Sequence, residues 1–545
     1  MFYKNLIFHI FDLRLSFEGT KMNRFKKFIL NGLILTAVSL IMRGVGVSFN
    51  VYISNTVGAE AMGLFTLIST VYGFAITLAT SGINLAVTRL VSEALGELSS
   101  SGIKINNGKT DSVRSVLLSC VGYSLFFSSL SCVLLFTAAP NISVIILKDE
   151  RCISSLRILS LTLIPISLSS VLSGYFSAVR RVYKNALTQI SEQIIKIFAC
   201  VFLLMFLFAD DAESACFCIS AGGVIAEMFS FLIQLLLYVC EKKDLSSANS
   251  SLPDKKIIKS KLRGIALPVA FSAYLRSALI TIEHILIPWG LERSGSSRAK
   301  SLAAYGTIHS MVFPIVFFPS ALLSSFAGLL VPEISQSKAE KKEKNIERIV
   351  SNVLETSLIF SIGTAGVMIF FAHELGYIIY PSTDAGIYIK MIAPLIPVMY
   401  LDTAVDAILK GLGEQVYSMG VNIVDSLLSV ILVLILLPVM GIEGYIITVY
   451  CTELINATLS ITRLFTVTKI KPLVFTRVIK PLFAIVLSSR IVKFASNIGI
   501  LSIPSSSAHI IAHITLSVVI YIVLLILFGS LKGKKIKKAI KLLES

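Results

Sequence analysis

Residues 28–54 read FILNGLILTAVSLIMRGVGVSFNVYIS, a stretch whose one charged residue is Arg43. It is long enough to cross the ~30 Å hydrocarbon core of a bilayer as a helix. Comparable apolar stretches recur along the 545 residues, of which 55% are hydrophobic and 15% charged. The sequence therefore predicts an all-α polytopic membrane protein, and a charge inside a span asks for an explanation.

About fourteen spanning helices are predicted, joined by loops too short for a soluble domain. We expect two six-helix lobes, residues 28–240 and 262–467, followed by two extra C-terminal helices within 468–530. In round boundaries the predicted spans are 29–54, 62–96, 113–140, 153–180, 185–208, 212–240, 262–290, 303–332, 349–371, 386–411, 416–438, 441–467, 474–498 and 508–530.

The distribution of the formal net charge of +17 along the chain indicates membrane topology and not nucleic-acid binding. Most lysines and arginines fall in segments that lie on one side if the N-terminus is cytoplasmic, as the positive-inside rule requires. We therefore expect both chain ends to lie in the cytoplasm. The cytoplasmic segments are the N-terminal 1–27, the linker 241–261 and the basic tail 531–545.

The segment 1–27 contains a second candidate start. Its first 21 residues are too polar to span a membrane, whereas the basic MNRFKKFIL that begins at Met22 resembles a natural N-terminus. We expect translation to begin at Met22. An interfacial amphipathic helix in the first 21 residues is the alternative.

Motifs for cofactors, metals and catalysis are incomplete. The stretch GIKINNGKT (102–110) has one residue too many between its glycines for a phosphate-binding loop, and it follows a membrane helix instead of a strand. His509 and His513 lack a third ligand, and the eight cysteines lie mostly inside spans, where they suit packing. We expect no cofactor, no metal and no enzyme activity.

The two predicted lobes carry a weak repeat. LIMRGVGVSFNVYIS (40–54) aligns with YLRSALITIEHILIP (274–288) when Arg43 is set against Arg276. The second unit also has an insertion of charged residues at 292–300. Because each unit has an even number of spans, we expect the lobes to be related by a pseudo-two-fold axis along the membrane normal.

Later spans continue this repeat. LTLIPISL (161–168) matches APLIPVMYL (393–401), and QISE and NIVD then pair Glu192 with Asp425. Folds of this kind place their substrate in a central cavity between the lobes.

Arg43 and Arg276 are candidate ligands for a phosphate-bearing substrate. A charge at the bilayer centre costs about 2.5–3.5 kcal/mol, so it faces a cavity or a partner. The arginine fork suits phosphate because it donates two parallel hydrogen bonds and keeps its charge. Asn50 and Glu283 follow by seven residues and share a face with the arginines. The alternative is an internal salt bridge, Arg43 to Glu227 or Arg276 to Glu283.

Arg89 is the third candidate arginine, and it follows a helix-breaking Ser-Gly pair that includes Gly82. Pro165 and Pro397 lie inside spans, where each removes a helical hydrogen bond and favours a kink. We expect Pro165, Pro397 and Gly82 to act as hinges. Close helix packing by small residues is the alternative for the glycine.

Intramembrane carboxylates are candidates for coupling transport to an ion gradient. Asp402 and Asp406 share one helix face, with Lys410 further along, and suit a proton or a sodium ion; interhelical anchoring is the alternative. Lys196, one turn after Glu192, is expected to neutralise it. The polar network comprises Glu192, Lys196, Glu227, Asp402, Asp406, Asp425 and Glu453.

Three stretches carry a family resemblance. They are GAEAMGLFTLISTVYGFAITLATSGINLAVTRLVSEALG (58–96), SGYFSAVRRVYKNALTQISEQIIKI (173–197) and LVPEIS (330–335). They resemble the stage V sporulation protein B family of polysaccharide-export proteins, within the superfamily of multidrug, oligosaccharidyl-lipid and polysaccharide exporters. The resemblance extends over nearly the whole chain from Met22.

The resemblance implies an alternating-access flippase for an undecaprenyl-diphosphate-linked saccharide, a peptidoglycan precursor or polysaccharide unit of spore cortex or cell-wall synthesis. Related lipid II flippases have an arginine-rich central cavity and a lipid groove formed by the last two helices. Arg43 matches the first-helix arginine of that cavity, whereas the second arginine of those flippases is here Phe49. Glu192 and Glu227 match positions typical of the sporulation subfamily.

Other functions stay open. A cation-coupled multidrug exporter of the same fold predicts a cavity of carboxylates and aromatic residues, and a non-transporting sporulation scaffold predicts no substrate site. A membrane-embedded glycosyltransferase needs an external loop with a catalytic acid, and the external loops here are too short. The expected partners are the lipid-linked saccharide, membrane lipids, a proton, sodium or potential coupling, and cell-wall synthesis machinery.

Overall fold

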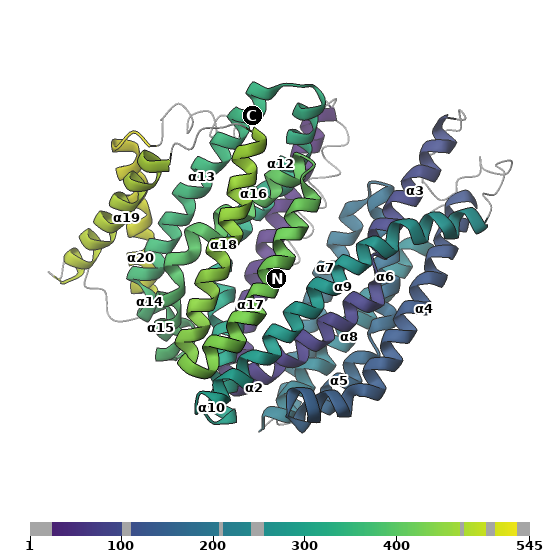
Figure 1. The fold of residues 1–545 in the computed structure, drawn as a ribbon, viewed down its shortest axis with the longest axis horizontal. Coiled ribbons are helices and arrows are strands. Elements are labelled where there is room, and N and C mark those ends of the chain that lie inside the picture. The colour runs from purple at the N-terminus through teal and green to yellow at the C-terminus, as the bar shows by residue number, and fades with distance from the viewer. Residues whose placement is uncertain are drawn as a thin grey trace.

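The structure, a computed structural model, contains only helical elements among the described residues (Figure 1). The proposed start at Met22, most of the linker 241–261 and the tail 531–545 lie outside the described residues. The described residues are 24–100, 111–206, 211–240, 255–468, 474–497 and 507–530.

The first half of the chain supplies a long bent helix and the helices that follow it. α2 contains the first predicted span and most of the second, joined across a non-helical Gly58 with φ of 84°. The elements are α2 (Arg24–Thr80), α3 (Ile83–Ser100), α4 (Asp111–Asn141), η1 (Ile142–Leu147), η2 (Glu150–Cys152), α5 (Ile153–Ser160), α6 (Leu163–Ala178), α7 (Val182–Phe206) and α8 (Ala212–Val239).

The second half begins with another long helix, α9. Its elements are α9 (Lys255–Arg293), α10 (Arg298–Gly306), η4 (Thr307–Val312), α11 (Phe313–Phe317), α12 (Ser320–Ala339), α13 (Glu343–Phe370), α14 (Ala372–Ile379), α15 (Thr383–Ile392), η5 (Ala393–Leu395), α16 (Ile396–Gly411), α17 (Gln415–Met440), α18 (Ile442–Thr468), α19 (Val474–Asn497) and α20 (Ser507–Leu527).

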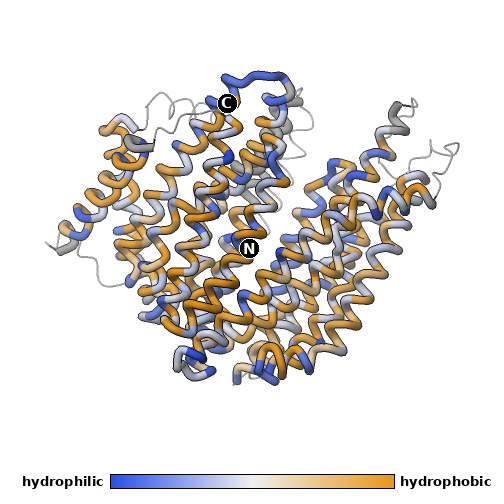
Figure 2. Tube along the Cα trace, viewed as in Figure 1, coloured by the Kyte–Doolittle hydropathy of each residue, from blue (hydrophilic) through white to orange (hydrophobic). Residues whose placement is uncertain are grey.

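The prediction of an all-α polytopic membrane protein is confirmed. Every predicted span is helical where the structure describes it. Nine described helices are long and apolar enough to cross a membrane, or ten if α5 and α6, bent by 44°, form one span. Hydrophobic residues dominate the middle of the helices and hydrophilic residues gather toward their ends (Figure 2). The chain is a multi-pass membrane protein.

The helices form two groups that lean apart (Figure 1). The first group is α3 to α8, and the second is α10 to α18, with α19 and α20 packed beside α13. We call the end where the groups meet, at α10 and the Gly58 bend, the joined end. The opposite end, at Ser100 and the turn between α12 and α13, is the diverging end. The positive-inside rule predicts that the diverging end is cytoplasmic.

The first helix of each half contacts both groups. α2 packs against α4 and α6 but also against α10 and α12, and α9 packs against α3 and α4 but also against α17. A Cβ on Gly44 of α2 would lie 3.7 Å from Phe318, whereas Leu262 and Ala266 of α9 are buried in the core of the first group. The first helix of each half thus packs partly against the other half of the chain, which suits a pseudo-two-fold relation between the halves. The limits 28–240 and 262–467 remain a prediction for the lobes.

Hydroxyl groups connect α2 to the second half. Thr66 and Ser310 share a hydrogen bond of 2.5 Å, and Thr77 donates to Ser277 at 3.3 Å. Thr281 donates to the carbonyl of Thr70 at 3.5 Å. We call this row of contacts between α2 and the α9–η4 region the seam. Such hydrogen bonds suit a membrane interior, where an unpaired polar group is costly.

Backbones touch at the joined end. A Cβ on Gly63 of α2 would lie 2.0 Å from the carbonyl oxygen of Leu302, and one on Gly306 would lie 2.3 Å from that of Ala59. These distances are shorter than any carbon–oxygen contact between side chain and backbone. Only glycine therefore permits this approach of α2 and α10.

An ion-pair cluster spans the two groups at the same end. Arg298 of α10 donates to Glu292 at 2.5 Å and to the carbonyl of Leu147, in the first group, at 2.5 Å. Its Nε lies 3.9 Å from Asp149, a residue only 8% exposed. Arg151 binds both Asp149 oxygens, at 2.9 and 2.8 Å. Arg298 therefore fastens the groups together, and we call this cluster the clasp.

We expect Gly63→Ala to lower the melting temperature of the purified protein in detergent, because the added methyl group overlaps the Leu302 carbonyl. Overpacking typically costs about 1–3 kcal/mol. Gly73→Ala is the matched control on the same helix, since nothing lies within 4 Å of a Cβ there. Alanine in an open helical position stabilises by about 0.5–1 kcal/mol. Equal melting temperatures for the two variants would contradict the close approach.

We expect Arg298→Gln to increase alkylation of Cys152, a fully buried thiol beside the clasp. A hydrogen bond to a charged group is worth about 1.5–3 kcal/mol, so the opened population should rise about tenfold or more. Mass spectrometry of the Cys152 peptide after timed maleimide treatment measures the rate. Arg293→Gln is the control, because Arg293 contacts Trp289 and not the clasp. An unchanged Cys152 rate in Arg298→Gln would show that the clasp does not hold this end closed.

Candidate functional site

Arg43 and Arg276 lie on α2 and α9, the two helices that contact both groups. Both residues are exposed. Arg43 lies within electrostatic range of Tyr400, and Arg276 within that of Asp425. The two arginines thus occupy equivalent helices of the repeat, each beside a helix of the second group.

Neither arginine forms an ion pair with a carboxylate of a described residue. The alternative partners are engaged elsewhere. Glu227 interacts with Glu192, and Glu283 accepts a hydrogen bond of 2.6 Å from Ser429. The internal salt bridges considered from the sequence are therefore absent from the described part of the chain.

The other members of the predicted stripe make helix–helix contacts. The Asn50 amide donates to the carbonyl of Ser310 at 2.6 Å, which extends the seam to the first predicted span. The Glu283 carboxylate, through Ser429, joins α9 to α17. Asn50 and Glu283 thus have structural roles, and their binding of substrate stays a prediction.

Arg89 lies on α3, and its Nε donates to Glu93 at 3.0 Å. Lys261 of α9 approaches the same carboxylate at 3.5 Å. The Arg89 side chain is 64% exposed, so most of its guanidinium can still meet an anion. It follows the break between α2 and α3 at Gly82, where φ is 69° and a Cβ would lie 2.9 Å from the Ala266 carbonyl.

Both prolines lie at the start of a helix and not in a helix interior. Pro165 lies in the first turn of α6, directly after the 44° bend that separates it from α5. Pro397 lies in the first turn of α16, after the short helix η5. Proline is tolerated in a first turn, where its missing N–H has no helical partner. Hinge motion at Pro165, Pro397 and Gly82 stays a prediction.

The first group holds the expected polar network. Ser230 of α8 donates to Glu192 of α7 at 3.0 Å. The Glu227 carboxyl interacts with both Glu192 and Lys196, so these three groups are brought together. A pair of carboxyls beside one ammonium is suited to holding a single proton.

In the second group, Asp402 and Asp406 lie within electrostatic range of each other but have different hydrogen-bond partners, and their joint role stays a prediction. Asp406 pairs with Lys410 at 2.5 Å and accepts a hydrogen bond from Ser418. Asp402 accepts from Asn456 at 3.4 Å. Its other carboxylate oxygen is buried, with no hydrogen-bond partner among the described residues.

Two further carboxylates complete this second network. Glu453 of α18 lies within electrostatic range of Asp402 and of Asp425, which is on α17. Glu283 lies within range of Asp425 as well. Each group therefore holds carboxyls on its fifth and sixth predicted spans, as a functional repeat requires.

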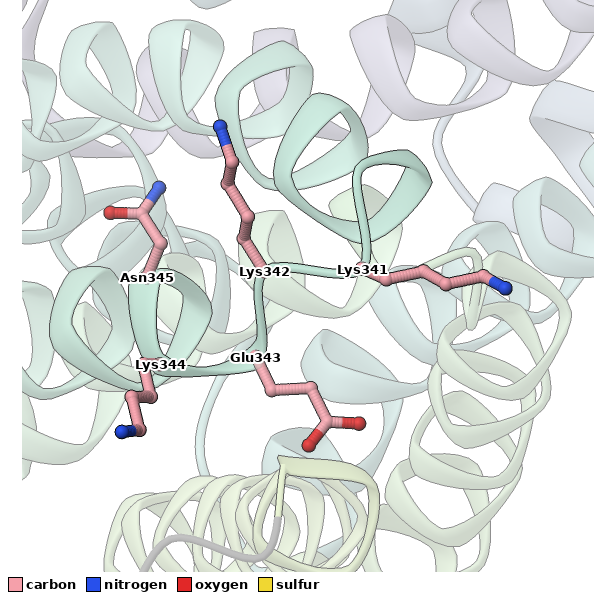
Figure 3. Close-up of a pocket in the computed structure, with 5 residues that line it drawn as sticks. All are labelled: Lys341, Lys342, Glu343, Lys344 and Asn345. Carbon is pink, nitrogen blue, oxygen red and sulfur yellow. The ribbon is translucent and has the colours of Figure 1, made fainter.

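A basic surface pocket lies at the diverging end, in the turn between α12 and α13. Its side chains point away from one another, so they do not converge on a ligand (Figure 3). Lys342 pairs with Glu340 at 2.6 Å, and this hydrogen bond lowers the pKa of Glu340. The lining residues are Lys341, Lys342, Glu343, Lys344 and Asn345. The basic charge of this turn suits the cytoplasmic side of a membrane.

Two polar features were missed from the sequence. The clasp was signalled only by the charged insertion at 292–300, and its partners in the first group gave no signal. His284 and His309 also lie in predicted spans, and each bonds a tyrosine hydroxyl, at 2.6 and 2.9 Å. A histidine inside an apolar span was the available signal.

Comparison with known proteins identifies the family. The family model described as polysaccharide biosynthesis protein matches residues 28–336, and the MatE model matches residues 294–435. Stage V sporulation protein B of Bacillus subtilis (strain 168) is 26% identical to this chain, over 94% of the chain and 97% of that protein. Lipid II flippase MurJ of the same organism is 23% identical, over 76% of the chain and 78% of that protein.

Solved structures share the fold. A structure of lipid II flippase MurJ in an inward closed conformation superimposes with a TM-score of 0.64 at 15% identity, covering 91% of this chain and 98% of that one. An inward-facing multidrug resistance transporter of the MATE family gives a TM-score of 0.61 at 13% identity, covering 80% of this chain and 100% of that one. The chain belongs to the polysaccharide biosynthesis protein family, within the superfamily of multidrug, oligosaccharidyl-lipid and polysaccharide exporters.

Proposed function

We propose that this protein is a flippase that moves an undecaprenyl-diphosphate-linked saccharide across the bacterial cytoplasmic membrane. The saccharide would be a peptidoglycan precursor or a polysaccharide unit of the cell wall or spore cortex. The family, the relatives named as a sporulation protein and a lipid II flippase, and the shared fold all support a transporter of lipid-linked saccharides.

The observation that carries the proposal is the pair of unmatched arginines. An arginine in a spanning helix costs about 2.5–3.5 kcal/mol without a partner, and neither Arg43 nor Arg276 forms an ion pair with a described carboxylate, although Asp425 lies within electrostatic range of Arg276. A diphosphate supplies the missing negative charge and accepts paired hydrogen bonds from each guanidinium. Their equivalent positions on α2 and α9 suit a ligand held between the two halves of the repeat.

The transport cycle follows from the arrangement of the helix groups. The diphosphate and its sugar enter from the diverging end, where the exposed Arg89 is the first cation they meet, and are then held by Arg43 and Arg276. Opening of the clasp and the seam releases them at the joined end, while the lipid tail stays in the bilayer. The protein needs no covalent chemistry, because the barrier it lowers is the desolvation of a charged headgroup.

The carboxyl networks are the proposed coupling elements. Glu192 and Glu227 in the first group, and Asp402, Asp425 and Glu453 in the second, can change their charge or bind a cation as the groups move. Buried carboxylates respond to an ion gradient because their ionised form needs a partner. A proton gradient, a sodium gradient or the membrane potential would then set the direction of transport.

A cation-coupled multidrug exporter is the second candidate. The MatE match over 294–435 and the likeness to a MATE transporter favour it, as do the carboxyls buried in both groups. Such a transporter would not depend on the two arginines, because a cationic drug is repelled by a guanidinium. The role of the arginines thus separates the two functions.

We expect protein-dependent flipping of a fluorescent undecaprenyl-diphosphate saccharide in liposomes, measured as the fraction of headgroups protected from an impermeant quencher. Arg43→Ala and Arg276→Ala should each reduce the rate by about tenfold or more, since a charge-assisted hydrogen bond is worth about 1.5–3 kcal/mol. Arg157→Ala is the control, because Arg157 of α5 is exposed and lies over the Phe136 ring of α4.

Equal flipping by wild type and both variants would make the arginines structural and place the site elsewhere. No flipping by folded wild type, with or without an imposed ion gradient or potential, would contradict the flippase. Export of a cationic dye by the same liposomes would then support the multidrug exporter, and its absence would favour a non-transporting scaffold.

A further inference from the structure

Two histidines and two tyrosines form a buried cluster in the second half of the chain. His284 of α9 shares a hydrogen bond of 2.6 Å with Tyr305 of α10, and His309 of η4 shares one of 2.9 Å with Tyr445 of α18. The two imidazole rings lie with their centroids 4.6 Å apart and their planes tilted by 55°. Tyr305 is 0% exposed and Tyr445 is 2% exposed. We call His284 and His309 the histidine pair.

The pair lies where the two groups are joined. His309 sits in η4, a single π-helical turn, and such turns are rare and often mark functional sites. The next residue, Ser310, accepts hydrogen bonds from Asn50 and shares one with Thr66 of α2. A change of charge at the pair therefore acts directly beside the seam.

The charged groups around the pair come from three elements. Glu283 adjoins His284 on α9 and lies within electrostatic range of Tyr305 and Tyr445. Glu453 of α18 lies within range of Tyr445, and Asp425 of α17 within range of Glu283. α15 also packs against η4, but its Asp384 and Lys390 are exposed. α2 contributes hydroxyl groups.

The chemistry of the pair favours a proton over a metal cation. Sodium and magnesium prefer oxygen ligands, whereas the pair offers imidazole nitrogens. No group of three or more histidine, cysteine or carboxylate side chains suited to a metal occurs among the described residues. Imidazole is the side chain that gains and loses a proton near neutral pH.

We propose that the histidine pair is a proton-binding site that links proton uptake to opening of the seam. The inference rests on the proposed transport function, because it names the coupling ion. One proton is shared by the two rings, since two adjacent imidazolium charges repel each other. Glu283, which precedes His284 in the chain, lies within electrostatic range of the two tyrosines bonded to the pair.

Protonation favours the opened joined end. An imidazolium is poorly solvated inside the packed seam but well solvated when water enters between α2 and η4. By linkage, a state that solvates the charge binds the proton more tightly, so acid shifts the population toward it. The proton gradient across the membrane then shifts the equilibrium between the closed and the opened seam.

The test uses the chain's one tryptophan, Trp289, which lies five residues after His284 on α9. We expect its fluorescence in the purified protein to titrate with a midpoint below the ordinary histidine value of about 6.5, because burial disfavours the imidazolium. The titration should be lost in His284→Gln and in His309→Gln. Tyr445→Phe, which removes only the hydroxyl bonded to His309, should shift the midpoint without abolishing the transition. His509→Gln on α20 is the matched control and should titrate like wild type.

This titration needs no lipid-linked substrate, so its failure is distinguishable from failure of the flippase proposal. A transition that persists unchanged in both histidine variants would overturn the proton site, as would loss of the transition in His509→Gln. Exchange of potassium for sodium at constant pH should leave the curve unchanged, and a sodium-dependent midpoint would assign the site to another cation. In liposomes, His284→Gln should lose the acceleration of transport by a pH gradient.

Discussion

A polar group inside a membrane must find a partner or face water, and this constraint organises the whole molecule. Hydroxyls on α2 bond to α9 and η4 along the seam, and carboxyls gather in networks within each group. Arg43 and Arg276 depart from this rule, because neither forms an ion pair with a described carboxylate and only Arg276 has one, Asp425, within electrostatic range. The absence of an ion pair at these two arginines is the strongest indication of a negatively charged ligand.

The two ends of the structure have opposite properties. At the joined end, glycine contacts, the seam and the clasp hold the groups together. At the diverging end the groups lean apart, and the exposed residues include Arg89 and the lysines of the α12–α13 turn (Figure 1). Since α2 and α9 contact both groups, movement of either group changes the surroundings of both arginines. In the proposed transport cycle, this arrangement would couple access at one end to closure at the other.

Hydropathy predicted the fold because each span is specified by its own residues, and the repeat predicted which helices correspond. The contacts of α2 and α9 with both groups were not predictable, since the direction of a helix does not determine which neighbouring helices it contacts. The clasp joins Arg298 to Leu147, far away in sequence. The side chain of Asn50 was predicted as a ligand from its helix face, yet it bonds to Ser310. The spacing of residues in the sequence predicts which face of a helix a side chain occupies, but not which group it contacts.

The most direct test of the account is native mass spectrometry of the purified protein with competing lipids. The central claim is that the paired arginines select a diphosphate. We expect wild type to retain an undecaprenyl-diphosphate saccharide in preference to undecaprenyl monophosphate and phosphatidylglycerol, with the preference lost in the Arg43→Ala, Arg276→Ala double variant. Equal retention of all three lipids by wild type, or an unchanged preference in the double variant, would contradict the account.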